Sequence, residues 1–206
     1  SMIQYGFIAG SRISLDSCDD LIDYFERAPD LYKGAGITGK GLDLSFKKST
    51  DMEVSPTNPD YRIQNYMREL SHVCDDYISL FPYSSEGQAT WNINIKFNIQ
   101  KYKPNEGFYG WHTERDTWKE MNPCRHLAFM TYLNDVTDGG HTEWFHQKLK
   151  IQPEKGMTYI WPVDWTHTHR GVTSPTQTKY IATGWYSYFV PHFDYKSYAD
   201  VDLNYS

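Results

Sequence analysis

The sequence predicts a mainly β domain with helices at its N-terminal side. Helical spacing of apolar residues is confined to the first third of the chain, and from about residue 90 onward apolar residues alternate with polar ones. Clusters of Gly, Pro, Asn and Asp separate several short runs of this second kind. Helices followed by many short strands indicate that the helices pack on one side of a mainly antiparallel β-sandwich or barrel.

Composition narrows the class of protein. A chain of 206 residues that is 39% hydrophobic and 17% aromatic suits one folded domain rather than a disordered segment. The net charge of −6 and the shortness of basic pairs such as Lys47-Lys48 argue against nucleic acid or a membrane surface as a partner. No run approaches the roughly 20 apolar residues of a membrane span, and no signal peptide is recognisable. We therefore expect a soluble, cytoplasmic protein of unknown oligomeric state.

Two helices are predicted in the first third. Ser17 and Asp20 form a plausible N-cap pair ahead of a short amphipathic helix that begins near Leu21. A longer helix is predicted after Asn58-Pro59, because apolar residues recur there every three or four positions. We interpret both helices as scaffold.

The predicted strands follow the helices. Apolar residues from Trp91 to Ile99 alternate with polar ones, which is typical of a strand with one buried face. Further strand-like runs cover residues 127–133, 142–145, 157–161 and 180–189. We expect residues 1–89 to support the same domain, residues 90–192 to form its core and residues 193–206 to be a C-terminal tail.

One short motif suggests a metal site. His112 and Glu114 lie two positions apart, so a strand would direct both side chains to the same side. The same spacing occurs at His141 and Glu143, so the pair alone is a weak signal. A third ligand is available in "THTHRGVTSPTQTKYIATGWY", which contains His167 and His169. Two histidines and one carboxylate on one face of a metal are the ligands of non-haem Fe(II) oxygenases.

The order of several segments is more specific than any single motif. The segments "KYKPNEGFYGWHTERD", "RHLAFMTYLND", "GGHTEWF", "QPEKGMTYIWP" and "HRGVTSPTQTKYIATGWY" resemble, in order, the iron(II)/2-oxoglutarate-dependent dioxygenases. Within that family the prolyl 4-hydroxylases are the most similar branch. The resemblance covers about residues 90 to 190 and implies a double-stranded β-helix, or jelly-roll, core with supporting helices.

The resemblance implies roles for particular residues. His112, Glu114 and His169 would be the iron ligands. His169 is preferred to His167 because the family usually places a basic residue about ten positions beyond the distal histidine, where Lys179 stands. Lys179 would pair with the distal carboxylate of 2-oxoglutarate, since a buried ammonium needs an anionic partner.

Three tyrosines and a tryptophan match family positions near the same pocket. Tyr102, Tyr109 and Tyr132 would line the cosubstrate site, with the Tyr132 hydroxyl donating to the distal carboxylate beside Lys179. Trp185 shares strand parity with Lys179, and we expect it to serve in core packing.

Glu114 departs from the family pattern, in which aspartate is the usual ligand. The extra methylene moves the carboxylate away from the backbone. Either the metal must therefore shift, or the strand that carries Glu114 must lie further from the metal. A carboxylate of either length argues against halogenation, because the related halogenases have a small residue at this position.

The implied activity is hydroxylation of an unactivated C–H bond with Fe(II), 2-oxoglutarate and dioxygen, releasing succinate and CO2. A prolyl residue in a peptide or protein is the first candidate substrate, and a free amino acid or another small molecule is the alternative. Two alternatives belong to other functional classes: a zinc hydrolase and a non-catalytic ligand-binding barrel. Residues expected at the pocket mouth are Arg115, Asp116, Trp118, Trp165 and Arg170.

Overall fold

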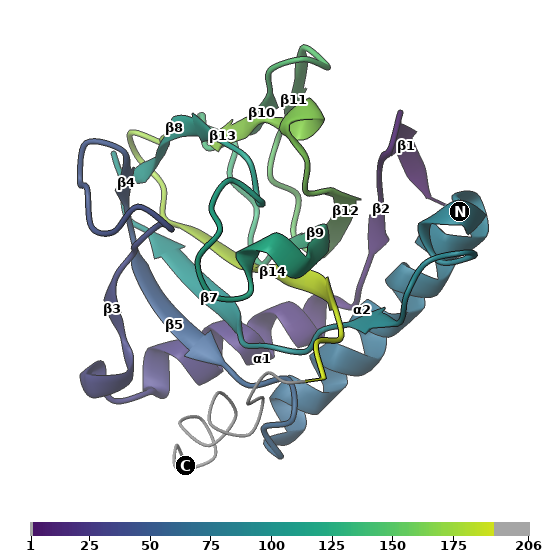
Figure 1. Cartoon of the computed structure of the whole chain (residues 1–206). Helices are drawn as coiled ribbons and strands as arrows, with labels where there is room; N and C mark the ends of the chain where they lie inside the picture. The colour runs from purple at the N-terminus through teal and green to yellow at the C-terminus, as the bar shows by residue number, and fades with distance from the viewer. Residues whose placement is uncertain (1, 192–206) are drawn as a thin grey trace.

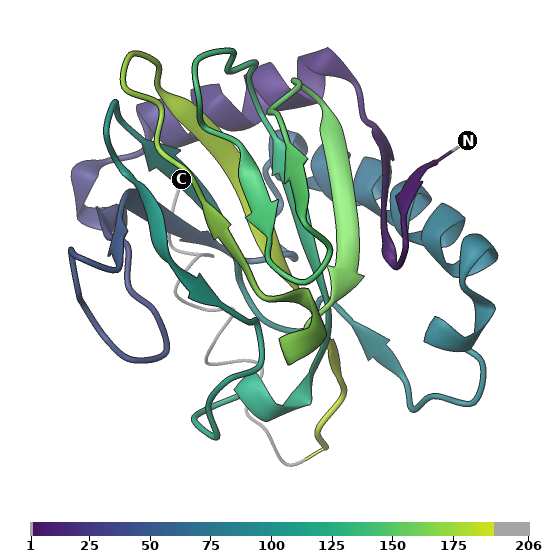
Figure 2. The same cartoon turned by 90° about the horizontal axis from the view of Figure 1, so that it is seen from above.

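Two antiparallel sheets face one another, and two long helices cover the outer face of the larger sheet (Figures 1 and 2). This computed structural model describes residues 2–191 of the chain, so the predicted tail at residues 193–206 lies outside the described residues. The predicted arrangement of helices on one side of a mainly antiparallel β structure is confirmed. The inner face of the smaller sheet, which faces the larger sheet, lines a cavity.

The helices are α1 (Leu15–Arg27) and α2 (Tyr61–Leu80). The predicted N-cap of the first helix was wrong, because Ser14, not Ser17, caps α1 by accepting the backbone N–H of Ser17 at 3.2 Å. Glu69 of α2 explains the difference. Its carboxylate accepts the backbone N–H of Ser14 at 2.9 Å and also the hydroxyl of buried Ser17. This contact between helices decides where α1 begins, and neighbouring sequence does not reveal it.

The larger sheet contains all the predicted strands except the run at 142–145, together with N-terminal strands that were not predicted. In spatial order it runs β1 (Ile3–Tyr5), β2 (Ile8–Arg12), β12 (Met157–Pro162), β9 (Arg125–Tyr132), β14 (Lys179–Tyr188), β7 (Phe97–Tyr102), β5 (Thr50–Val54) and β3 (Gly34–Ala35), with β6 (Trp91–Asn92) also paired to β14.

The smaller sheet carries His112 on β8 (Gly107–His112) and His169 on its central strand, β13 (His169–Gly171). Its order is β11 (Leu149–Ile151), β10 (Thr142–Trp144), β13, β8 and β4 (Lys47–Lys48). Short 3-10 helices at Asp30–Tyr32, Pro82–Ser84, Asn122–Cys124 and Trp165–His167 lie in the connections.

One predicted strand is interrupted. The alternating run from Trp91 to Ile99 forms β6 and β7, with a break between them. In the break, the Asn92 side chain accepts the backbone N–H of Ile93 at 2.8 Å, and the Asn94 side chain donates to the carbonyl of Ser187 at 2.7 Å. Asparagine side chains compete in this way with the backbone ladder that a strand requires.

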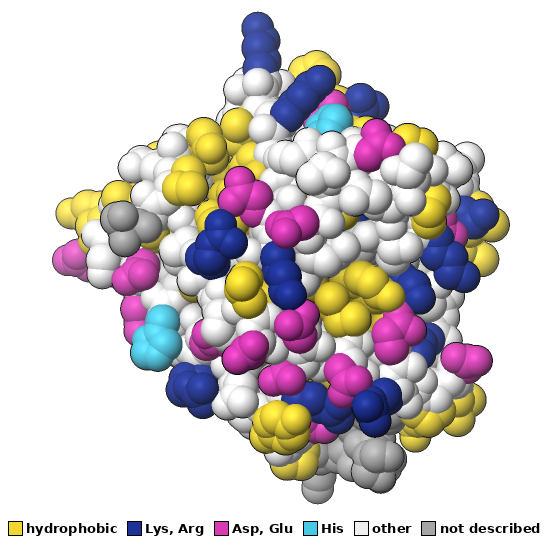
Figure 3. Space-filling view, turned by 180° about the vertical axis from the view of Figure 1, so that it is seen from behind, with side chains coloured by type: hydrophobic (Ala, Val, Ile, Leu, Met, Phe, Trp, Pro, Cys, Tyr) yellow, Lys and Arg dark blue, Asp and Glu magenta, His cyan; other side chains and the backbone are white. Residues whose placement is uncertain are grey.

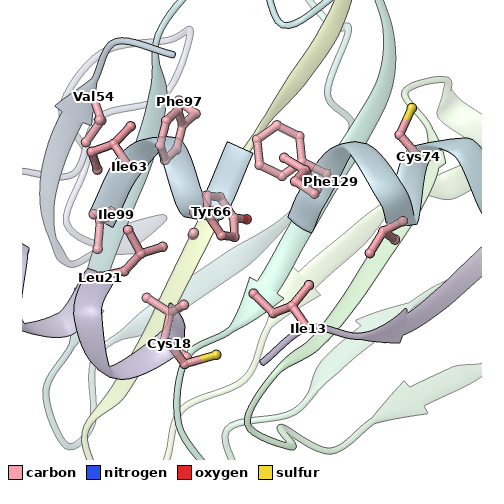
Figure 4. Close-up of a cluster of buried hydrophobic side chains, with 14 of the residues drawn as sticks. Ile13, Cys18, Leu21, Val54, Ile63, Tyr66, Cys74, Phe97, Ile99 and Phe129 are labelled. Atoms are coloured by element: carbon pink, nitrogen blue, oxygen red, sulfur yellow. The ribbon is translucent and has the colours of Figure 1, made fainter. Parts of the chain in front are cut away.

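The main core lies between the helices and the larger sheet (Figure 4). Leu21 of α1 and Ile63 of α2 are completely buried in it. Tyr66 of α2 is buried as well, and its hydroxyl shares a 2.8 Å hydrogen bond with the hydroxyl of Thr131 on β9. Burying each large apolar side chain contributes roughly 1.5–3 kcal/mol, so this layer fixes α1 and α2 against the sheet.

The outer surface bears mixed charge. On the face shown in Figure 3, acidic and basic side chains are interspersed, so this face carries no continuous basic patch. Across residues 2–191, no helix combines the length and apolar character that crossing a bilayer would demand.

Candidate active site

Strand pairing brings the three candidate ligands together. β8 and β13 are antiparallel neighbours, and His112 stands directly opposite His169. Glu114 follows the end of β8, where its backbone N–H donates to the carbonyl of Val163 at 3.2 Å. Because side chains two residues apart on an extended segment share a side, Glu114 and His112 point to the same place.

The three side chains have the geometry of a metal site. Oε1 of Glu114 lies 3.0 Å from Nε2 of His169 and 3.7 Å from Nε2 of His112. The candidate ligand atoms all lie within 4.8 Å of one another, and this is the one group of three such residues found between positions 2 and 191. Each histidine Nδ1 is 2.9 Å from a backbone carbonyl, that of Gly110 or His167. An Nδ1–H that donates to a carbonyl leaves the Nε2 lone pair free for a metal.

The electrostatic environment of His112 and Glu114 favours the forms of these two residues that bind metal. Burial lowers the pKa of His112, which favours the neutral imidazole. For Glu114, burial alone would raise the pKa, but interactions with the two histidines outweigh it and hold the pKa well below its ordinary value of 4.5. A neutral imidazole and an ionised carboxylate are the protonation states that metal coordination requires.

Aromatic packing fixes the histidine rings. The ring of Phe108 stacks on His112 with centroids 3.6 Å apart and planes 13° apart. Trp144 and Trp161 contact His169 from two sides, with centroids 5.9 and 5.3 Å away. These contacts restrict the imidazole orientations, so the ligand geometry is preorganised.

Gly110 makes room for another aromatic ring beside the site. A Cβ added at Gly110 would lie 1.9 Å from the ring of Phe46, which is a severe clash. The backbone N–H of Gly110 also donates to the carbonyl of Phe46 at 3.1 Å. A glycine in β8 therefore lets the segment before β4 approach the site closely.

A cavity of about 820 Å³ opens beside the three side chains. This volume lies in the range of small-molecule sites, roughly 300–1,000 Å³. The lining includes both sheets: His112 and His169 come from the smaller one, and Tyr102 and Lys179 from the larger one.

Lys179 is the buried cation of this cavity. Its side chain is at the start of β14, opposite Tyr102 of β7, and only 4% of the residue is exposed. The ammonium donates to the carbonyl of Gly140 at 2.9 Å and lies 5.0 Å from the Tyr102 ring centroid. Within residues 2–191 no carboxylate forms an ion pair with it, and burial lowers the pKa of Lys179 to about 8. A buried ammonium without an anion favours binding of an anionic ligand.

The three predicted tyrosines occupy different places. Tyr102 lines the cavity, and its hydroxyl donates to Oε1 of Gln100 at 2.7 Å. The Tyr132 hydroxyl is 2.6 Å from the Thr142 hydroxyl, and it is Thr142 that lines the cavity. The Tyr109 hydroxyl donates to the carbonyl of Asn105 at 2.8 Å, and Tyr109 is not part of the cavity lining. A cosubstrate role for Tyr132 or Tyr109 stays a prediction.

His167 and the second His-x-Glu pair are separate from this cluster. Nδ1 of His167 is 2.8 Å from the hydroxyl of Thr166, and His167 is not part of the three-residue group. The second His-x-Glu pair belongs to a surface network, because Glu143 is 2.9 Å from both His141 and Arg170.

Of the five residues expected at the pocket mouth, only Asp116 lines the cavity. Arg115 forms an ion pair with Asp164, while Trp118 and Trp165 are 82% and 70% exposed. Arg170, held by Glu143, lies over the ring of Trp111 at 4.4 Å.

Sequence reasoning missed a second buried lysine in the cavity wall. Lys47 is 2% exposed and forms an ion pair with Asp51 at 2.8 Å, while the Ser49 hydroxyl donates to the same carboxylate at 2.7 Å. In the sequence, Lys47-Lys48 is a short basic pair, and nothing in it indicates that Lys47 is buried. Lys47 turns inward because β4 pairs with β8, which places it opposite Phe108, and no local signal indicates this pairing.

The expectation for Trp185 needs revision, because its indole does more than pack. The indole N–H donates to Oε2 of Glu114 at 3.1 Å. The guanidinium carbon of Arg125 lies 3.5 Å from the centroid of the Trp185 ring. Trp185 lines the cavity together with Lys179, with which it shares strand parity, whereas nothing in the sequence indicated a role for Arg125.

Comparisons with known proteins agree with this geometry. The family model described as the 2OG-Fe(II) oxygenase superfamily matches residues 97–187. No curated protein matches the sequence.

Several solved structures share the fold. A viral collagen prolyl hydroxylase from Paramecium Bursaria Chlorella virus-1, solved as a 2OG complex, is 19% identical with a TM-score of 0.65, covering 89% of this chain and 97% of that one. A Pseudomonas putida prolyl-4-hydroxylase is 13% identical with a TM-score of 0.66, covering 89% and 93%. A Trichoplax adhaerens prolyl hydroxylase, solved with a hypoxia inducible factor peptide fragment, is 14% identical with a TM-score of 0.64, covering 94% and 86%.

Proposed function

We propose that this chain is a member of the 2OG-Fe(II) oxygenase superfamily, whose model matches residues 97–187 and whose members use Fe(II), 2-oxoglutarate and dioxygen. We propose further that it hydroxylates a prolyl residue in a peptide or protein. One observation carries the assignment of the site: a buried lysine, which has no anionic partner among residues 2–191, lines the same cavity as a His-Glu-His cluster. A metal alone would leave Lys179 uncompensated, whereas a dianionic keto acid supplies an anion at each end.

The residues present fit these groups. His112, Glu114 and His169 would hold the iron, and Lys179 would bind the distal carboxylate of 2-oxoglutarate. The Thr142 hydroxyl lines the cavity and is itself held by Tyr132, so Thr142 is placed to donate to the cosubstrate. When bound, the iron and its cosubstrates supply the oxidant that inserts an oxygen atom into a C–H bond while 2-oxoglutarate is converted to succinate and CO2.

The protein's own contribution is positioning and exclusion of water. Met130, Trp161 and Ile181 give the cavity apolar wall area near the charged groups. In such an environment the interaction of Lys179 with a carboxylate is stronger than in water, because the local dielectric is low. None of these side chains is required to transfer a proton.

Support for a peptide substrate comes from the cavity and the structural relatives. A cavity of about 820 Å³ is larger than a five-carbon dicarboxylate needs, so it leaves room for a substrate side chain at the mouth. The similar solved structures are named as prolyl hydroxylases, and one of them holds a peptide. A free amino acid remains the alternative that the substrate experiment below addresses.

The test is substrate-stimulated formation of succinate. We expect purified protein to convert 2-oxoglutarate to succinate with Fe(II) but not with Zn(II), and a proline-containing peptide to stimulate turnover. Matched peptides with alanine in place of proline, and free proline, are the substrate controls. Stimulation by free proline alone would contradict the peptide assignment, and no succinate under any of these conditions would contradict the oxygenase assignment of the site.

A further inference from the structure

We propose that Trp185 is a positioning residue that presents only one oxygen of Glu114 to the metal. The inference rests on the metal site of the proposed function. It concerns the position where this chain has glutamate instead of the shorter aspartate.

The two carboxylate oxygens of Glu114 have different partners. Oε1 faces the Nε2 atoms of His169 and His112 at 3.0 and 3.7 Å. Oε2 accepts the indole N–H of Trp185 at 3.1 Å. An indole nitrogen can only donate, so it satisfies the oxygen that the metal does not use and cannot itself become a ligand.

Two strands keep the indole in this place. Lys179, Ile181, Thr183 and Trp185 alternate along β14, and all four line the cavity. β9 pairs with β14 so that Ala128 is opposite Trp185, and Arg125 at the start of β9 lies over the indole.

Arg125 joins the indole to the ligand. Its guanidinium is 3.5 Å from the Trp185 ring centroid, and its Nη1 donates to the backbone carbonyl of Glu114 at 3.0 Å. The same guanidinium therefore contacts the donor ring and the backbone of the acceptor. This contact restricts the rotation of the indole relative to Glu114.

The arrangement addresses a problem that comes with glutamate. Its side chain has one more rotatable bond than that of aspartate, so its carboxylate reaches further and has more orientations. If both oxygens bound the metal, Glu114 would occupy a second coordination position. That position would no longer be open to the cosubstrates, which need free coordination sites. By donating a hydrogen bond to Oε2, Trp185 keeps this second coordination position of the metal open.

The first experiment measures Mn(II) affinity by anaerobic calorimetry. Trp185→Phe retains an aromatic ring but removes the N–H, and we expect it to weaken Mn(II) binding by roughly 10- to 100-fold, as removing an outer-shell partner typically does. In a Glu114→Asp background the side chain is one methylene shorter, and we expect it to lose the contact with the indole. The same change should then alter affinity by less than about twofold, because the coupling is gone. Equal weakening in both backgrounds would show that Trp185 acts through packing and would overturn the proposal.

A second experiment observes the hydrogen bond directly and does not depend on Glu114→Asp retaining metal. In an NMR spectrum of ¹⁵N-labelled protein, the indole N–H of Trp185 is identified by its absence from Trp185→Phe. We expect this proton to exchange slowly with water before and after Zn(II) is added. Rapid exchange in the Zn(II)-loaded protein would mean that Oε2 has left the indole, and the proposal would fail.

Failure of this inference is distinguishable from failure of the proposed function. If the wild-type protein binds no Mn(II), the metal site itself is wrong. If the wild-type protein binds Mn(II) and forms succinate but Trp185→Phe binds Mn(II) equally well, only the role of Trp185 is wrong.

Discussion

At the scale of single residues, Lys179 separates this site from other sites with two histidines and a carboxylate. Its ammonium is buried, and within residues 2–191 its hydrogen-bond acceptor is a neutral carbonyl, that of Gly140. A zinc hydrolase mechanism assigns no role to a buried ammonium. A cosubstrate with a distal carboxylate would neutralise its charge.

Replacing Lys179 with alanine should abolish tight cosubstrate binding but leave the metal in place. Removing one partner of a buried charge pair costs about 3–5 kcal/mol. This corresponds to a loss of roughly a hundredfold or more in 2-oxoglutarate affinity. Calorimetric titration of 2-oxoglutarate into Mn(II)-loaded protein measures this loss, and Mn(II) titration is the control. Unchanged affinity for 2-oxoglutarate would mean that the cosubstrate binds elsewhere.

The affinity for 2-oxoglutarate should also depend on pH. Burial lowers the pKa of Lys179 from 10.5 to about 8, so the charged form is present below about pH 8 and is lost as pH rises through that value. Binding of the distal carboxylate needs the charged form, and affinity should therefore fall by up to about tenfold per pH unit above pH 8. Lys179→Arg is the matched control, because arginine stays charged and should remove this dependence. A wild-type affinity that is constant from pH 7 to 9.5 would contradict the prediction.

At the scale of elements, the register between β8 and β13 decides which histidine joins the site. His169 is paired with His112, while His167 lies in the 3-10 helix before β13. Both histidines are buried, so burial alone does not distinguish them.

Alanine substitutions in this segment test the register. His169→Ala should lose measurable Mn(II) binding because one of three ligands is gone, whereas His167→Ala should retain it. Calorimetry with Mn(II) compares the two variants, and circular dichroism checks that both are folded. The reverse outcome would shift the predicted ligand by two residues and remove the spacing that assigns Lys179.

At the scale of the whole molecule, the helices support one face of the larger sheet (Figure 2). The cavity of the site is lined by residues of both sheets. The ligands come from β8 and β13 of the smaller sheet and the buried lysine from β14 of the larger one. A metal and a cosubstrate bound together would therefore link both sheets.

Metal binding should stabilise the whole fold. Mn(II) at about 100 times its Kd should raise the free energy of unfolding by roughly 2.7 kcal/mol, because the unfolded chain lacks the site. For a domain of this size the expected rise in Tm is roughly 2–4 °C per kcal/mol. Differential scanning calorimetry measures the shift, with His169→Ala as the control. An equal rise in His169→Ala would place the bound metal at another site.

The sequence alone predicted the features that depend on local pattern. The period of two identified four strands within a few residues, and the spacing of His112, Glu114, His169 and Lys179 indicated one site, because side-chain direction along a strand repeats every two residues. The family and the cofactors followed from the order of the motifs, and the family match agrees.

Only the tertiary structure decided which distant groups meet. The start of α1 depends on Glu69, the burial of Lys47 on the pairing of β4 with β8, and the second oxygen of Glu114 on Trp185. The Tyr132 hydroxyl contacts Thr142, a partner that no nearby residue indicates. These contacts join residues from ten to about seventy positions apart, so they are set by strand register and by packing between layers, and a local pattern contains neither.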